Sequence, residues 1–474
     1  MSLYEISSKK IIVPQNLAKI PVRAEYDLIV AGGGVAGISA AIAAGREGVK
    51  TLLIERNGFL GGTATAAAMA IFGAPYSHAH GIYREICDRL IEAGGGSLAK
   101  TCVVFDPEVF KWVVLEMLNE AGVTVMPYTV VVDAILDENQ TVRGLVICNK
   151  QGQEAILSKV TIDCTGDADV AYYSGAQYQK GREKDEKMRP LTLIFRIGNV
   201  DFEKLKAYTD KHPEKFSNQP DKNLFDLENN AIRLFGFFEE LEKARSKGEI
   251  TGDIHYLRFE GGNVKAKTLF LNTTRVYHKD GTNAEHLFQS DVEARKQIDE
   301  LLAFLRKYVP GCEDCVLLDT ANNLGVRETR RIIGEFIFDE EHVASKTLFS
   351  DRIAINYQYG LVGAPMHSPD GGEGSMKDSR ERGGVKAFLH GYSLPYRILI
   401  PKGINSLLVA GRCLSVTHLG DHWTRPMPTC MITGQAAGVA AALAIKTSLQ
   451  PRDLKISDLQ EALRSQKINL GEFK

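Results

Sequence analysis

The sequence lacks an excess of charge of either sign. Its 474 residues include 57 lysines and arginines and 59 aspartates and glutamates, which leaves a formal net charge of −2. A protein without a strong positive field has no general means of attracting DNA, RNA or an anionic membrane surface. We therefore expect no nucleic-acid partner and no membrane partner.

Long apolar runs and an export signal are also missing. No window of 18 or more apolar residues occurs, and the longest candidates, residues 407–410 and 436–445, are short or rich in alanine and glycine. Residues 1–15 carry charges and a proline where a signal peptide needs an apolar stretch. These features predict a cytoplasmic protein without a membrane span.

The eight cysteines are scattered, without the dense spacing of a disulfide framework. Cys312 and Cys315 form the one C-x-x-C pattern, directly after Pro310 and Gly311. No second C-x-x-C or H-x3-H partner lies nearby, so we predict no metal site. A structural turn is the favoured interpretation of the pair, and a redox pair or half of a zinc site is the alternative.

What the sequence does contain is the order of a βαβ unit over residues 25–62. An apolar run is followed by a glycine-rich turn, and a helix of small residues begins at about Val35. Gly32, Gly34 and Gly37 have the G-x-G-x-x-G spacing, at which side chains would block the approach of backbone N–H groups to a pyrophosphate. The positive end of the helix dipole would point at the same phosphates.

Glu55 closes the second apolar run of this unit, 18 residues beyond Gly37. At this position a carboxylate accepts hydrogen bonds from both hydroxyls of an adenosine ribose and repels a 2′-phosphate. The spacing therefore predicts a dinucleotide-binding site.

The chain is predicted to form two domains that are interleaved in sequence, because its length exceeds what one hydrophobic core usually supports. Three β-rich runs separated by turn residues predict a β-meander over residues 129–136, 142–149 and 154–162. The predicted divisions are an N-terminal arm (1–24), a first nucleotide-binding part (25–184), a substrate or cap domain (185–390), a second nucleotide-binding part (391–450) and a C-terminal tail (451–474).

Residues 405–444 form the last informative block. A short strand over residues 407–410 ends at Gly411, and a helix of small residues begins near Pro428. Glycines and alanines spaced by three and four allow such a helix to lie close to another backbone or to a flat ligand.

Four separated pieces of the sequence carry a resemblance to a known family. They are GGGVAG with Glu55, GFLGGTAT at 58–65, DCTGDADVA at 163–171, and AGRCLSVTH with RPMPTCMITGQAAG in the last block. With them the chain resembles the FAD-dependent oxidoreductases of the glutathione-reductase-like class, and more narrowly a broad bacterial group of undefined substrate. The implied fold class is α/β: a glutathione-reductase-type Rossmann FAD domain with an inserted β-meander, plus a discontinuous α+β substrate domain.

The resemblance implies that backbone and side-chain groups from all four pieces hold FAD, together with Arg56 beside Glu55 and Val131 in the meander. The matching positions are Gly32, Gly34, Val35, Ala36, Gly37, Glu55, Arg56, Gly61, Gly62, Thr63, Val131, Thr165, Gly166, Asp167, Gly411, Arg412, Met427, Pro428 and Thr429.

The same resemblance suggests catalytic residues. His418 and Arg425 keep family positions in the last block, and His367 matches a histidine that usually follows an acid. Pro365 stands where that acid is expected, and Leu419 replaces an expected acidic residue, so the family's roles do not transfer directly. We expect His418 or His367 to move a proton.

The segment GVRETRRIIGEF at 325–336 also resembles a family signature. Arg327, Arg330 and Arg331 are therefore candidates for holding a substrate carboxylate or the flavin. The alternative is a solvated or salt-bridged helix face, which is typical of a charge run.

Absences within the family pattern narrow the reaction. Residues 62–75 contain no cysteine pair, which a disulfide reductase of this class needs. No second strand, G-x-G-x-x-G and helix order for a nicotinamide occurs over residues 170–400. Residues 58–70 hold no His, Cys or Tyr, so we expect FAD to be bound without a covalent bond.

The sequence therefore predicts an FAD-dependent oxidoreductase that transfers a hydride between flavin N5 and a small or medium organic substrate. Arg425 and Arg327 would hold an anionic group of that substrate. The electron acceptor stays open, so both a dehydrogenase and an oxidase fit. The alternatives are an FAD-binding redox sensor or structural protein without turnover, and an NAD-dependent dehydrogenase.

Overall fold

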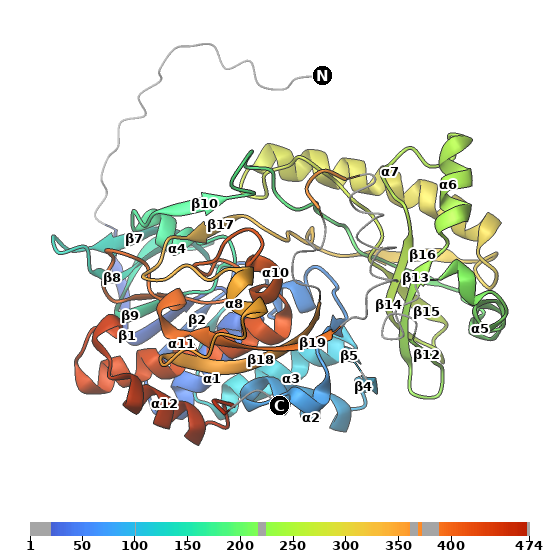
Figure 1. Cartoon of the computed structure of the whole chain (residues 1–474). Coiled ribbons are helices and arrows are strands. Elements are labelled where there is room, and N and C mark those ends of the chain that lie inside the picture. The colour runs from blue at the N-terminus through green and yellow to red at the C-terminus, as the bar shows by residue number, and fades with distance from the viewer. Residues whose placement is uncertain (1–19, 100, 217–223, 361–367, 372–387, 472–474) are drawn as a thin grey trace, which may run out of the picture.

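The computed structural model describes residues 20–99, 101–216, 224–360, 368–371 and 388–471. Two large sheets lie at opposite ends of the molecule in Figure 1, the first surrounded by helices from both ends of the chain. His367, one of the predicted catalytic residues, lies outside the described residues.

The first sheet has the strand order β6-β2-β1-β9-β8-β7, and β20 also pairs with β9. Its strands are β1 (Val22–Ala31), β2 (Thr51–Ile54), β6 (Thr124–Met126), β7 (Val130–Leu136), β8 (Val142–Asn149), β9 (Gly152–Asp163) and β20 (Leu407–Val409). Strands β6, β2, β1, β9 and β20 pair in parallel, whereas β7, β8 and β9 form an antiparallel meander. The predicted βαβ unit and β-meander are confirmed, and the ends of the three meander strands lie within two residues of those predicted.

Helices and small sheets complete this part of the molecule (Figure 1). The helices are α1 (Val35–Arg46), α2 (Gly81–Glu92), α3 (Pro107–Glu120), α4 (Asp169–Tyr173), α8 (Glu340–Ala344), α10 (Asp421–Thr424), α11 (Met427–Thr447) and α12 (Ile456–Ser465), with 3-10 turns η1 (Gly62–Ala64), η2 (Tyr76–His78), η5 (Tyr396–Leu399) and η6 (Pro451–Asp453). The small sheets pair β3 (Ile71–Phe72) and β4 (Gly96–Ala99) with β5 (Cys102–Phe105), β10 (Tyr178–Lys180) with β17 (Arg330–Ile332), and β18 (Arg352–Gly360) with β19 (Phe388–Pro395).

The second large sheet is antiparallel, in the order β12-β13-β14-β15-β11-β16. Its strands are β11 (Phe195–Gly198), β12 (Leu224–Asp226), β13 (Ala231–Gly236), β14 (Leu257–Asn263), β15 (Thr268–Leu271) and β16 (Val316–Thr320). The helices that accompany it are α5 (Phe202–Lys211), α6 (Phe238–Ser246) and α7 (Ala284–Tyr308), with the turn η3 (Pro213–Lys215).

Each large sheet has its own hydrophobic core. The core beside the first sheet also takes in Phe338 and Ile353, whereas the second is built from residues 191–321. Cys312 and Cys315 are buried free thiols in this second core, and burial raises the pKa of both. Such thiols suit the structural interpretation of the C-x-x-C pattern, because a reactive thiol needs a lowered pKa. The predicted domain boundaries stay a prediction.

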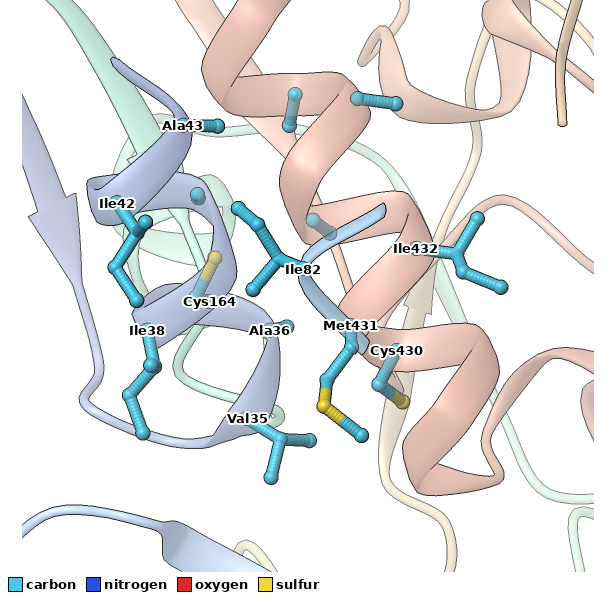
Figure 2. Packing of buried hydrophobic residues seen from close by; sticks show 14 of the residues in the cluster. Val35, Ala36, Ile38, Ile42, Ala43, Ile82, Cys164, Cys430, Met431 and Ile432 are labelled. Atoms are coloured by element: carbon cyan, nitrogen blue, oxygen red, sulfur yellow. The ribbon is translucent and has the colours of Figure 1, made fainter. Parts of the chain in front are cut away.

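One helix pair brings together the two ends of the chain. Helix α1 and helix α11 lie side by side, and Figure 2 shows Ala36 of α1 near Cys430 and Met431 of α11. A β-carbon added at Gly434 would lie 2.1 Å from the carbonyl oxygen of Ala36, and one at Gly438 would lie 2.2 Å from that of Ala40. The two backbones can approach this closely only because both positions are glycine.

Replacing Gly438 by alanine should therefore destabilise the protein by about 1–3 kcal/mol, the usual cost of overpacking a core. Alanine is about 1 kcal/mol better than glycine inside a helix, so helix propensity alone predicts the opposite sign. Urea unfolding measures the difference. The control, Thr447→Ala at an exposed position of α11, should change the free energy of unfolding by less than about 0.5 kcal/mol. A Gly438→Ala variant as stable as the parent would contradict this account of the helix contact.

Helix α11 is the one described helix that is long and apolar enough to cross a membrane, with a mean hydropathy of 1.4 over an 18-residue window. Of that window, 89% is buried inside the protein. Its apolar composition is explained by its place in the core, where it packs against α1.

Candidate functional site

Two glycine-rich segments meet at the carboxyl end of β1. The N–H of Gly61 donates to the carbonyl of Gly33 at 2.8 Å, and Gly61 pairs with Gly34 in a β-bridge. Gly32 has φ 103° and Gly61 has φ 114°, values that favour glycine. The first and second predicted glycine motifs therefore form one backbone platform.

The glycines of the first motif are required for different reasons. A β-carbon at Gly37 would lie 1.8 Å from the carbonyl oxygen of Gly32, so Gly37 allows close packing of helix on strand. A β-carbon at Gly34 would meet no atom within 4 Å, and Gly34 lines a cavity. The absence of a side chain at Gly34 thus leaves open space at the N-terminus of α1, where backbone N–H groups attract an anion.

The carboxylate of Glu55 is buried and held by three hydrogen bonds. Oε2 accepts from the Gly33 N–H at 2.7 Å, while Oε1 accepts from the backbone and side chain of Asn57 at 2.8 and 2.7 Å. Glu55 also lines the cavity. Oε1 accepts two of these bonds and Oε2 accepts one, so the carboxylate is fixed in place and Oε2 is still able to accept a ligand hydroxyl.

The cavity has a volume of about 580 Å³ and runs along both glycine motifs to the start of α11. Fourteen of the predicted cofactor residues line it, namely Gly32, Gly34, Val35, Ala36, Glu55, Arg56, Gly62, Thr63, Thr165, Gly166, Asp167, Gly411, Arg412 and Met427. Arg425, predicted as catalytic, lines it as well. Segments far apart in the sequence are thus brought to one cavity.

The other predicted cofactor residues do not line this cavity. Gly37 and Gly61 shape the backbone beside it, and Val131 lies in β7 opposite Ile147. Pro428 and Thr429 are buried in the first turn of α11. The Thr429 hydroxyl accepts from Asn356 Nδ2 at 2.7 Å, so it anchors the helix start.

The turn after β9 is fixed by a buried acid. Asp163 accepts hydrogen bonds from Thr165 N and Oγ1 through Oδ1, at 3.0 and 2.7 Å, and from Ala171 N through Oδ2 at 2.9 Å. Burial raises the pKa of Asp163 to about 6. The turn that Asp163 holds presents Gly166 and Asp167 to the cavity.

Asp167 and Arg412 form an ion pair of 2.7 Å on the cavity wall, and Thr329 bonds to both. Burial alone would raise the pKa of Asp167, but the charge and hydrogen bond of Arg412 lower it. The pair holds the Arg412 guanidinium in one position beside Gly411 and the start of α11.

His418 is buried and does not line the cavity. Its Nδ1 lies 2.9 Å from Glu328 Oε1, whereas its Nε2 is buried with no hydrogen-bond partner. Glu328 also pairs with Arg331, and Arg189 bonds to Asp421 at 3.2 Å. These residues form a buried ionic network, whose members are Arg189, Glu328, Arg331, His418 and Asp421.

The three arginines of segment 325–336 have different surroundings in the structure. Arg331 belongs to the buried ionic network, and Arg330 pairs with Asp169 at 2.9 Å and stacks on Tyr172. Arg327 is buried and donates through Nη1 to the carbonyl of Pro190. The helix of the predicted alternative is wrong, because this segment is not helical and its β17 pairs with β10. The salt bridges of that alternative are present, at Arg330 and Arg331.

One wall of the cavity was not predicted from the sequence, namely the wall formed by residues between 281 and 326. Gly281, Leu287, Asp291, Asn322 to Leu324 and Val326 line the cavity from that side. Asn323 donates its N–H to the carbonyl of Ala66 at 2.8 Å and so joins the two walls. Arg189, Glu328 and Asp421 were also missed, and nothing in their local sequence marks them as buried.

Comparison with known proteins adds a family match. The family model described as FAD dependent oxidoreductase matches residues 27–463. Among characterised proteins, a dihydrolipoamide dehydrogenase of Chaetomium thermophilum is 60% identical over 40 residues, which is 8% of either chain. A thiamine thiazole synthase of Methanococcus aeolicus is 33% identical over 160 residues, which is 31% of this chain and 57% of that protein. The chain therefore spans less than two thirds of these relatives.

Solved structures resemble this one over most of its length, at low sequence identity. A geranylgeranyl bacteriochlorophyll reductase-like protein from Thermoplasma acidophilum has a TM-score of 0.45 and 13% identity, over 94% of this chain and 84% of that chain. L-proline dehydrogenase from P. horikoshii has a TM-score of 0.40 and 10% identity, over 94% of this chain and 99% of that chain.

Proposed function

Because this chain belongs to the FAD dependent oxidoreductase family and takes FAD as its cofactor, we propose that it transfers a hydride between a small or medium organic substrate and flavin N5. One observation carries the proposal. Residues from the first βαβ unit, from the turn after β9 and from the start of α11 line the same cavity. We also propose that the fold is of the glutathione-reductase type.

The residues present fit an extended dinucleotide. Gly34 and the N-terminus of α1 would hold the pyrophosphate, because a β-carbon at Gly34 would meet no described atom within 4 Å. Glu55 would accept a ribose hydroxyl through Oε2, and its fixed negative charge favours a cofactor without a 2′-phosphate.

The opposite end of the cavity would take the flavin ring. When bound, FAD supplies a two-electron acceptor at N5, and the protein supplies orientation and charge. The first turn of α11 directs backbone N–H groups and the positive end of its dipole toward the cavity at Met427. Arg412 is held beside this turn by its ion pair with Asp167, so it would present a guanidinium of fixed orientation.

The proton-transfer role of His418 stays a prediction, and the structure restricts how it could work. Nδ1 is engaged by Glu328, so only Nε2 is free to exchange a proton. Glu328 would hold the ring in one orientation, as a carboxylate does for a catalytic histidine. His418 and Arg327 do not line the cavity, so among the predicted catalytic residues that the structure describes Arg425 alone has direct access to it.

We expect the purified protein to be yellow and to release its FAD on acid precipitation, since the FAD is proposed to be non-covalent. Hydroxy acids, amines and enoates are then tested anaerobically for loss of flavin absorbance at about 450 nm, the band of an oxidised flavin. Bleaching by a member of the panel supports turnover. A protein that keeps FAD but is never bleached would instead be a redox sensor or structural flavoprotein, and a colourless protein with bound NAD would overturn the proposal.

The electron acceptor is decided by a second measurement. Stopped-flow mixing of the reduced protein with air distinguishes an oxidase, which reoxidises rapidly and forms peroxide, from a dehydrogenase, which reoxidises slowly.

A further inference from the structure

Buried arginines outnumber their acidic partners near the cavity. Of the five arginines that are buried among the described residues, three pair with carboxylates: Arg189 with Asp421, Arg258 with Glu260 and Arg331 with Glu328. Over the described parts of the chain, Arg275 and Arg327 have no carboxylate oxygen within 4.0 Å. These two arginines carry buried charge that no neighbouring acid neutralises.

Arg275 is satisfied by neutral oxygens. Its Nη1 donates to Thr192 Oγ1, Asn272 O and Thr274 O at 3.2, 3.1 and 2.7 Å. Because its donors are satisfied by these oxygens, Arg275 stabilises the local fold and has no need of a ligand.

Arg327 is different, because most of its donors lack a good partner. Apart from the bond to Pro190, its one further contact is from Nη2 to Asn272 Oδ1 at 3.5 Å, which is long for a hydrogen bond. A guanidinium has five N–H donors in a flat fork. Arg327 thus retains donors in the geometry that matches a carboxylate.

The charge of Arg327 is costly where it lies. Burial, together with the charges of Arg275, Arg425 and Arg258, lowers the pKa of Arg327 well below its usual value. Arginine does not escape this cost by losing its proton, as a buried lysine does. An anion placed beside Arg327 would remove the penalty.

Arg327 does not itself line the cavity, but it lies close behind the cavity wall. Its neighbour Val326 lines the cavity, as does Arg425, whose charge is felt at Arg327. Arg425 is itself weakly paired: its Nε is buried without a hydrogen bond, and the Asp421 carboxylate is 3.6 Å away. Arg425 therefore lines the proposed flavin end with a donor to spare, and Arg327 lies behind the wall at Val326, where its charge interacts with that of Arg425.

We propose that Arg327 and Arg425 together bind a carboxylate group of the substrate, so that the substrates are organic acids. That the bound acid is a substrate rests on the proposed function. Binding of a carboxylate at Arg327 and Arg425 does not require turnover. A carboxylate fits because its single negative charge would neutralise the unpaired positive charge of Arg327. Its two oxygens can also accept two parallel N–H bonds from one guanidinium. A phosphate dianion shares part of this chemistry and is distinguished by the test.

The test uses the FAD-loaded protein and benzoate as the probe. Benzoate is titrated at constant ionic strength, and binding is followed by isothermal calorimetry and by the change in the flavin spectrum. Arg327→Gln should weaken benzoate binding at least tenfold with unchanged FAD content, and Arg327→Lys should weaken it less, because a lysine keeps the charge but not the fork. Arg196→Gln, a partly exposed arginine paired with Asp319 in the same part of the chain, is the matched control and should bind benzoate as the parent does.

Three results would overturn the inference: no benzoate binding by the parent, equal binding by Arg327→Gln, or inorganic phosphate binding as tightly as benzoate. The proposed function would survive each of them if any compound of the panel bleaches the flavin. Conversely, Arg327-dependent benzoate binding in a protein whose flavin is never reduced would support the anion site and refute the proposed function. If Arg327→Gln does not fold, Arg327→Lys decides, because it must still weaken benzoate binding.

Discussion

Replacing Gly34 by valine should give a folded protein that retains no FAD. The backbone at Gly34 has φ −72° and ψ 178°, an extended conformation that valine adopts without strain. A β-carbon there meets no protein atom within 4 Å, so the new side chain enters the cavity where we place the pyrophosphate. We expect the ratio of FAD to protein after purification to fall from about one to near zero, because the backbone donors are then blocked.

The control for this experiment is Gly73→Val. Gly73 also has open space at its β-carbon, but it does not line the cavity. This variant should keep FAD at the parental ratio. Gly34→Ala should retain an intermediate amount, because its side chain is smaller. Full FAD retention by a folded Gly34→Val protein would refute our placement of the cofactor.

Replacing Glu328 by alanine should destabilise the protein by about 3–5 kcal/mol, the cost of leaving a buried ion pair without one partner. The side chain of Glu328 is fully buried, and its removal leaves Arg331, Arg189 and His418 without their shared carboxylate. Urea unfolding measures the loss. Glu120→Ala removes the partner of Arg89 at a site where the carboxylate is 51% exposed, and it should cost less than about 1 kcal/mol.

Comparing the parent with Glu328→Ala at different pH values tests the ionisation of Glu328. Burial opposes ionisation of Glu328, but the hydrogen bond from His418 and the charges of Arg189 and Arg331 lower its pKa overall. A lowered pKa contributes stability above the unfolded value of about 4.3, and this contribution is lost as the pH falls through the folded pKa. The stability gap between the parent and Glu328→Ala should therefore be constant near neutral pH and shrink in acid. A gap that widens in acid would contradict the assignment of Glu328 as the ionised centre of the network.

Much of the nucleotide site could be predicted from the sequence because its determinants are local. The spacing of Gly32, Gly34 and Gly37 records where the backbone must come close to a ligand or to another backbone. Likewise, Asp106 before Pro107 predicts the start of α3, and Asp106 accepts the N–H of Glu108 at 2.8 Å. Such signals lie within a few residues of each other and need no knowledge of the fold.

The buried ionic network could not be predicted in this way. A charged residue in the sequence is most often exposed, and only the tertiary fold brings Arg189, Glu328 and Asp421 together. The helix face considered for residues 325–336 failed for the same reason. β17 takes its conformation from β10, which lies about 150 residues earlier in the chain, and a local charge pattern carries no record of that partner.

The pairing of α1 with α11 has a consequence for synthesis. The ribosome makes Val35 early and Met427 near the end, so the small-residue face of α1 has no helix to cover it for most of translation. At about 5–20 residues per second, this delay lasts roughly 20 to 80 seconds. The nucleotide cleft is therefore a late product of biogenesis, and a nascent chain stalled before β20 exposes apolar surface that a chaperone would recognise.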